Sequence, residues 1–211
     1  MKAVFAAFLI LATGLGLASA RASAPNDSKA SLAPPQNMET CFSPEEKCDE
    51  RLIAFLGTAN HTDDVTLYNL THRGIAKALE DARARVVKVR VVADQGQAEF
   101  KPSLVAQLNN EGFSFVFATK LADYSLMHDK FTIVDGRMLE TGSYNYTMAA
   151  TKNNHENQLY VDVASVVARY QQNFDKMFAE GTPMPAGFKN EKSYSDCPAA
   201  TPTPAPSPAP F

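Results

Sequence analysis

The central part of the chain alternates between helical and strand patterns of hydrophobic residues. Apolar positions with a helical period predict helices over residues 72–85, 102–110 and 166–178, and an earlier helix that Ser43 and Pro44 cap and start. β-branched and aromatic runs predict strands over residues 65–70, 86–92, 113–118, 131–134, 138–141 and 158–163. Asp135 and Gly136, between two of these strands, indicate a hairpin turn. Strands alternating with helices predict an α/β/α layered sandwich around a mixed, partly parallel sheet.

Both ends of the chain differ from this middle part. Lys2 precedes an apolar run and small-residue A-x-A sites, the pattern of a secretory signal peptide. We therefore expect residues 1–24 to be cleaved and the protein to be secreted or periplasmic. A retained N-terminal anchor is the alternative, although the run is short for a membrane span. Residues 25–39 are typical of a linker and residues 198–211 of a Pro-rich solvated tail. The folded domain is predicted at residues 40–197, with its first ordered residues at about Met38.

Charge limits the choice of partner. Hydrophobic residues make up 45% and charged residues 20% of the 211 residues, which is a globular composition. Removal of residues 1–24 leaves 18 basic against 23 acidic side chains, a net charge of −5. A surface with a net negative charge does not attract phosphate polymers as a whole, so binding of nucleic acid needs a local basic patch. Arg83, Arg85, Lys88 and Arg90 form a basic run that is either a solvated face or such a patch.

The three cysteines allow one disulfide within the chain. Outside the cytosol Cys41 can pair with Cys48, or Cys197 can tie the end of the domain to its start. The sequence leaves this choice open. The C-x6-C spacing, with no nearby Cys/His pair, does not predict a zinc site.

One stretch contains residue types that suit phosphate chemistry. His128 and Lys130 stand two apart at the start of a strand, so their side chains leave the same face. Gly142 permits a close backbone approach, and Ser143 and Asn145 add a hydroxyl and an amide. A nucleophilic nitrogen, a fixed cation and neutral donors at one strand end would suit a phosphodiester. A surface His and Lys on an ordinary strand is the alternative interpretation.

The spacing of these residues resembles the signature of the phospholipase D superfamily. The pattern is His128-x-Lys130-x4-Asp135-x6-Gly142-Ser143-x-Asn145. Residues 41–44, 67–71 and 154–157 resemble the small single-motif branch. That branch includes bacterial secreted or periplasmic endonucleases and mitochondrial cardiolipin hydrolase-like nucleases. The resemblance covers roughly residues 40 to 180.

The chain departs from this pattern in three ways. Asp129 stands where a second His is frequent, and Tyr146 where Trp or Phe is frequent. The Cys/His insertion that builds a zinc site in some mitochondrial relatives is missing. Asp135 belongs to the motif and is counted with the catalytic candidates, although a hydrogen-bonding role at a strand end suits it better than that of a general base.

The resemblance implies a covalent mechanism without a metal or cofactor. His128 would attack phosphorus and give a phosphohistidine that water resolves. Because the chain holds one motif, the resemblance implies a homodimer in which two copies of His128 share one site. Lys130, Ser143 and Asn145 would hold the non-bridging oxygens, and Glu156 would orient the histidine.

The other histidines have weaker interpretations. His61 lies in a polar turn and is expected at the surface. His72 stands at a helix start, where a capping role is favoured over contact with substrate. His155 adjoins Glu156 and is either exposed or at the rim of the site.

Three functions are compatible with these residues. The favoured hypothesis is a metal-independent, non-specific endonuclease that hydrolyses DNA and could accept RNA. The alternative is a phospholipase D-type lipid phosphodiesterase acting on phospholipid or cardiolipin. An inactive interaction domain displayed on the Pro-rich tail is the third, and the complete set of motif residues speaks against it.

Overall fold

The computed structural model describes residues 37–122, 125–193 and 195, all within one compact unit, Pro35–Phe211. The predicted signal peptide, linker residues 25–36, Cys197 and the Pro-rich tail lie outside the described residues. In the part that is described, no helix combines the length and apolar character needed to cross a bilayer.

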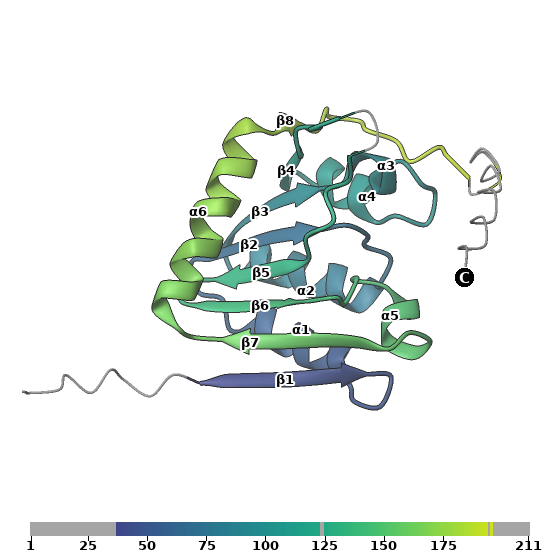
Figure 1. The fold of residues 1–211 in the computed structure, drawn as a ribbon. Helices are drawn as coiled ribbons and strands as arrows, with labels where there is room; N and C mark the ends of the chain where they lie inside the picture. The colour runs from purple at the N-terminus through teal and green to yellow at the C-terminus, as the bar shows by residue number, and fades with distance from the viewer. Residues whose placement is uncertain (1–36, 123–124, 194, 196–211) are drawn as a thin grey trace, which may run out of the picture. The chain divides into compact units, whose positions relative to one another are not determined.

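Eight strands form one sheet in the order β1-β7-β6-β5-β2-β3-β4-β8 (Figure 1). The strands are β1 (Met38–Ser43), β2 (Thr62–Leu67), β3 (Lys88–Ala93), β4 (Ser114–Phe117), β5 (Phe131–Val134), β6 (Met138–Gly142), β7 (Glu156–Val161) and β8 (Thr182–Pro183). The helices are α1 (Cys48–Gly57), α2 (Arg73–Ala84), α3 (Gln95–Ala98), α4 (Val105–Asn110), α5 (Met148–Lys152) and α6 (Ala164–Glu180). β2, β3 and β4 run parallel, and the other pairs are antiparallel. The sheet is therefore mixed, as predicted, with more antiparallel pairing than one hairpin.

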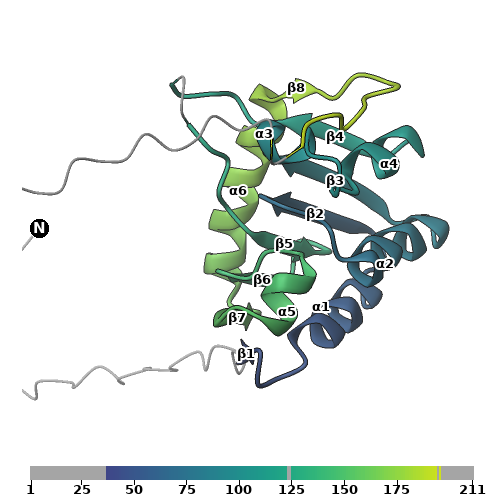
Figure 2. The ribbon, with the colours of Figure 1, turned by 90° about the vertical axis from the view of Figure 1, so that its right-hand side faces the viewer.

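Helices cover both faces of the sheet. α1 and α2 pack on one face, where Leu52, Leu56 and Leu79 are fully buried. α6 lies on the opposite face, where Phe131 and Phe174 are buried (Figure 2). Alternation along each strand supplies apolar residues to both layers. The predicted α/β/α sandwich is confirmed.

The N-terminal part of the domain corrects one prediction. Ser43 ends β1, pairs with Glu156 of β7, and donates from Oγ to the carbonyl of Ala150 at 2.6 Å, so it does not cap a helix. The helix begins at Cys48 instead. A disulfide joins Cys41 to Cys48, which is the local option left open by the sequence. It ties the end of β1 to the start of α1.

The arginines of the basic run bind groups within the protein. Arg90 was expected to point outward, but α6 covers this face, and its guanidinium contacts Asp64 at 2.6 Å and Asp175 at 2.8 Å. Arg83 donates to the carbonyl of Glu111, and Arg85 to carbonyls at the end of α1. The guanidinium groups of this run are therefore occupied by protein partners.

The topology gathers several connections at one end of the sheet. β2, β3 and β6 end there, while β5 and β7 begin there, on the right of the sheet in Figure 1. Side chains that precede β5, follow β6 and start β7 therefore come together although they are separated along the chain.

Candidate active site

His128 and Lys130 form a close pair at the start of β5. The ammonium of Lys130 lies 3.2 Å from Nδ1 of His128 and donates to its main-chain oxygen at 2.6 Å. Lys130 is buried, whereas His128 is exposed. Because an ammonium can only donate, Nδ1 accepts, and the proton of the neutral ring then lies on Nε2. The pair thus presents Nε2 to an incoming group and keeps a cation beside it.

Burial and nearby charges act on this lysine in opposite directions. Burial lowers the pKa of Lys130, while the carboxylates of Asp129 and Glu156 act to raise it, and the net direction is downward. The two carboxylates are therefore close enough for their charges to reach the ammonium.

An aromatic ring supports both members of the pair. Tyr68 comes just after β2. The centroid of its ring lies 4.6 Å from the centroid of the His128 ring and 5.0 Å from the ammonium nitrogen of Lys130. Its hydroxyl accepts from Nε2 of Gln97 at 3.1 Å. A ring beside a buried ammonium contributes a cation–π interaction. The sequence placed residues 67–71 in the family resemblance but did not single out Tyr68, because its neighbours come from distant segments.

Asp94 anchors the segment in front of His128. One carboxylate oxygen accepts from the main chain of Gln97 at 2.9 Å, and the other accepts from the main chain of Met127 at 3.0 Å. Asp94 is buried, and it thus joins the end of β3 to the residue that precedes His128. This anchor was not predicted, since the strand-end position of Asp94 gave no sign of its partner 33 residues later.

The connection after β6 places Ser143 beside Glu156. A Cβ at Gly142 would stand 2.1 Å from the carbonyl oxygen of Asn157, so glycine is required for this close approach. Ser143 Oγ donates to Glu156 at 2.5 Å and accepts from the main chain of Asn157 at 3.1 Å. The other Glu156 oxygen accepts from Asn154 at 3.0 Å. The described residues show no hydrogen bond from Glu156 to His128, so its orienting role stays a prediction.

Asn145 lies on the same connection and has an unused acceptor. Its Oδ1 is buried and has no hydrogen-bond partner among the described residues. Its neighbour Tyr146 is fixed by main-chain bonds to Asn69, Thr71 and His72, which holds the connection against the end of β2. Five of the six predicted site residues thus lie at one end of the sheet: His128, Lys130, Ser143, Asn145 and Glu156.

Asp135 lies at the opposite end of β5, so the structure does not bring it to the other candidates. Its carboxylate accepts main-chain N–H groups from Asn60, His61 and Thr62 at 2.7–3.2 Å. Burial acts to raise the pKa of Asp135, but these N–H groups outweigh it and lower the pKa. This geometry matches the expected hydrogen-bonding role at a strand end and favours it over a catalytic role.

Asp135→Asn is expected to cost stability but not turnover. The residue has a positive φ of 52°, which Asn tolerates, so the substitution tests the carboxylate itself. Loss of charge-assisted bonds should lower the free energy of unfolding by about 2 kcal/mol. Urea unfolding measures this, and kcat should stay close to the wild-type value at a temperature where the variant is folded. A large fall in kcat in the folded variant would contradict this assignment.

The other histidines are not in the site. His72 caps α2, where Nδ1 accepts from the main chain of Ile75 at 3.2 Å and Nε2 lies 3.3 Å from Asp49. Its predicted capping role is confirmed. His61 is exposed, as expected, and His155 has an exposed fraction of 90%.

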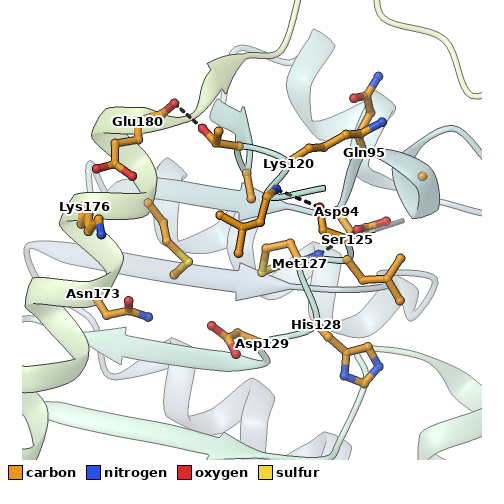
Figure 3. A pocket seen from close by; sticks show the side chains of 16 residues that line it. Asp94, Gln95, Lys120, Ser125, Met127, His128, Asp129, Asn173, Lys176 and Glu180 are labelled. Carbon is orange, nitrogen blue, oxygen red and sulfur yellow. Dashed lines mark hydrogen bonds between the residues drawn. The ribbon is translucent and has the colours of Figure 1, made fainter. Parts of the chain in front are cut away.

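A cavity of about 640 Å³ adjoins His128 (Figure 3). It lies between residues 118–121 and 125–129, the start of α3 and the second half of α6. His128 and Asp129 form part of its lining, and in Figure 3 their side chains point in different directions. The His128 ring and the Asp129 carboxylate therefore lie on different sides of the chain at the edge of this cavity.

Within the described residues, one group of potential metal ligands occurs, Cys41, Glu46 and Cys48. Both sulfurs are joined in the disulfide, so thiolates are not available there.

A family model covers most of the described domain. Residues 52–178 match the model of the cardiolipin synthase, PLD-like domain. The chain is a hydrolase of phosphodiester bonds by class. It belongs to the phospholipase D superfamily.

Curated relatives come from eukaryotes and bacteria. The chain is 33% identical to the mitochondrial cardiolipin hydrolase of Chlamydomonas reinhardtii over 61% of its own length and 56% of that protein. It is 32% identical to the mitochondrial cardiolipin hydrolase of Xenopus tropicalis over 74% of each chain. Identity to the phospholipase D of Rickettsia bellii is 31%, over 65% of this chain and 67% of that protein.

Solved structures share the fold. The phospholipase D family member Nuc from Salmonella typhimurium has a TM-score of 0.66 at 24% identity, covering 72% of this chain and all of that one. NucT from Helicobacter pylori also has a TM-score of 0.66, at 22% identity, covering 71% of this chain and all of that one.

Proposed function

We propose that the protein is an exported, metal-independent nuclease that hydrolyses DNA, and accepts RNA, through a phosphohistidine formed at a dimeric site. The observation that supports this chemistry is the 3.2 Å contact between the Lys130 ammonium and Nδ1 of an exposed His128. It combines a nucleophilic nitrogen with a cation able to hold a phosphoryl group, at a position that substrate can reach.

The reaction would take place in two displacements. The Nε2 lone pair of His128 forms a bond to phosphorus while the bond from phosphorus to the leaving oxygen breaks, and a second imidazole protonates that oxygen. Water then attacks phosphorus, the second imidazole takes the proton of the water, and the P–N bond breaks. Phosphoryl oxygens bound at Lys130 would draw its ammonium from Nδ1, which permits the tautomer with a lone pair on Nε2.

The second imidazole would come from another copy of the chain. His61 lies at the opposite end of the sheet, His72 caps α2, and His155 lies 3.8 Å from Glu45. The partner subunit's His128 is therefore the candidate that we propose for this role. The exposure of His128 supports a site completed across a two-fold axis. In this arrangement neither subunit holds a complete acid and nucleophile pair.

Nucleic acid is favoured as substrate by the openness of the site. His128 and Asp129 are exposed, and polar side chains line much of the adjoining cavity, which suits a polymer lying across the surface. Nuc and NucT, whose whole chains match this domain, are of similar size. Lipid is the second candidate, because Leu121 and Leu126 are 92% and 60% exposed beside the cavity, and because several relatives are cardiolipin hydrolases.

A side-by-side assay separates the two substrates. The mature protein is incubated at low salt with plasmid DNA, single-stranded RNA, and vesicles that contain cardiolipin or phosphatidylcholine. We expect nicking and cleavage of nucleic acid, and the same rates in excess EDTA. Release of lipid headgroup without cleavage of nucleic acid would establish the lipid alternative, and loss of activity in EDTA would contradict a metal-independent mechanism.

A further inference from the structure

The cavity beside His128 contains polar side chains without a hydrogen-bond partner among the described residues. Asp129, Asn173 and Lys176 line it, and the structure gives none of their side chains a hydrogen bond or ion pair with another described residue. In contrast, both carboxylate oxygens of Asp94 accept hydrogen bonds from main-chain N–H groups. The cavity therefore combines a carboxylate, an amide and an ammonium that are all accessible to solvent and have no hydrogen-bond partner among the described residues.

These groups surround a volume suited to an organic side group. At about 640 Å³ the cavity falls within the range of small-molecule sites, and Met127 and Met177 supply apolar, polarisable surface. Asp129 and Asn173 extend into it from opposite sides in Figure 3. A flat heteroaromatic ring could lie against the methionines and present its polar edge to the carboxylate and the amide.

The position of the cavity links it to the scissile phosphate. His128 and Asp129 are consecutive, exposed residues, and the ring of one and the carboxylate of the other leave the chain in different directions. A substrate held at the His128 ring would need to pass over this exposed edge to place a neighbouring group in the cavity. A nucleotide has the required shape, because its base and phosphate extend from opposite ends of a sugar.

We propose that this cavity binds an unpaired base next to the scissile phosphate, and that Asp129 selects bases that carry an exocyclic amino group. The proposal rests on the nuclease function above. A carboxylate only accepts hydrogen bonds, so it pairs with the amino group of cytosine, adenine or guanine. Uracil and thymine offer one N–H flanked by two carbonyl oxygens, which a carboxylate repels.

Lys176 explains how a carboxylate can be tolerated beside a polyanion. It lies three residues after Asn173, so both side chains leave neighbouring positions on one face of α6. Its ammonium adds a positive charge to the cavity that can balance Asp129 or contact an adjoining phosphate. The lining holds the ammonium groups of Lys120 and Lys176 beside the carboxylates of Asp94, Asp129 and Glu180, so positive charge offsets most of the negative charge.

Oligonucleotides of deoxycytidine and deoxyuridine provide the test. The two bases are equal in size. Cytosine has an amino group at position 4 and an acceptor at N3, whereas uracil has a carbonyl and an N–H there. The ratio of the two cleavage rates therefore reports hydrogen bonding to the base. At slightly alkaline pH we expect the wild type to cleave the deoxycytidine polymer about five- to tenfold faster. Asp129→Asn, whose amide also donates, should bring this ratio near one. Asp81→Asn removes the same charge from α2, far along the helix from the site, and should keep the wild-type ratio.

The possible outcomes separate the proposal from the nuclease function. Equal wild-type rates on both polymers, or an unchanged ratio in Asp129→Asn, would overturn base selection while leaving the nuclease intact. Failure to cleave either polymer, with hydrolysis of phospholipid vesicles, would overturn the nuclease function itself. A uniform change of all rates in Asp129→Asn, at constant ratio, would show that Asp129 acts only on Lys130 and would also overturn the proposal.

Discussion

His128→Ala should lower the rate of phosphodiester cleavage by at least about 10⁴-fold, because it removes the nucleophile and, in the proposed dimer, also the acid. Phosphodiester hydrolysis is among the slowest uncatalysed reactions, and the cation and donors left at Lys130 and Ser143 cannot replace a covalent step. Single-turnover cleavage of a labelled oligonucleotide measures the loss. Wild-type protein quenched during turnover should contain phosphate bound to histidine, and the variant should not.

His61→Ala is the matched control for this variant. His61 is exposed and lies beside Asp135, at the other end of the sheet from His128. The same change there should leave the rate within error of wild type. Substantial cleavage by a folded His128→Ala protein would remove this residue from the role of nucleophile.

The His128→Ala variant also tests whether two subunits share one site. If both copies of His128 are needed, a mixed dimer is inactive. Equal amounts of wild-type and variant protein, after subunit exchange, should show about half the activity of the wild type alone. Undiminished activity after proven exchange would show that each subunit works by itself.

Local pattern was sufficient to predict the core of this site. His128 and Lys130 depend on the period of one strand, and Gly142 and Ser143 follow the next strand directly. The hairpin between these strands is short, so the four residues must come together once the strands form. This explains why these four residues could be expected to lie together without knowledge of the fold.

Contacts between residues far apart in the sequence could not be predicted from local patterns. β1 pairs with β7 more than 100 residues later, and its sequence lacks the apolar alternation that marks a strand. Arg90 was assigned to solvent because nothing near it in sequence shows that α6 returns over that face. Tyr68 meets His128 only through the topology of β2 and β5. Errors therefore occurred where the partner of a residue lies far along the chain.

Glu140 is another residue that the sequence gives no reason to bury. It lies on β6 between Thr132 of β5 and Tyr160 of β7 and has an exposed fraction of 1%. Its carboxyl group accepts from the Tyr146 hydroxyl at 3.1 Å. Burial raises the pKa of Glu140 from 4.5 to about 8, although the bond from Tyr146 acts to lower it. The folded protein thus holds a proton here that the unfolded chain releases near pH 4.5.

Glu140→Gln should therefore stabilise the protein at high pH. With a raised pKa, the folded state binds more protons than the unfolded state between the two values, so wild-type stability falls as pH rises from about 4.5 to about 8. Gln is neutral throughout and close in shape, so it lacks this slope. We expect similar stability of both proteins near pH 4.5, and a variant more stable by about 4 kcal/mol at pH 8 and above.

Urea unfolding at a series of pH values measures the difference between the two curves. Asp63, whose pKa burial raises to about 7, adds a slope of the same sign to both proteins, so it cancels in that difference. Glu50→Gln makes the same chemical change at an exposed carboxylate of α1 and should give a difference that is small at every pH. A Glu140→Gln curve parallel to that of the wild type would mean that the buried carboxyl is ionised in the folded state. In that case a cation or water network must compensate its charge.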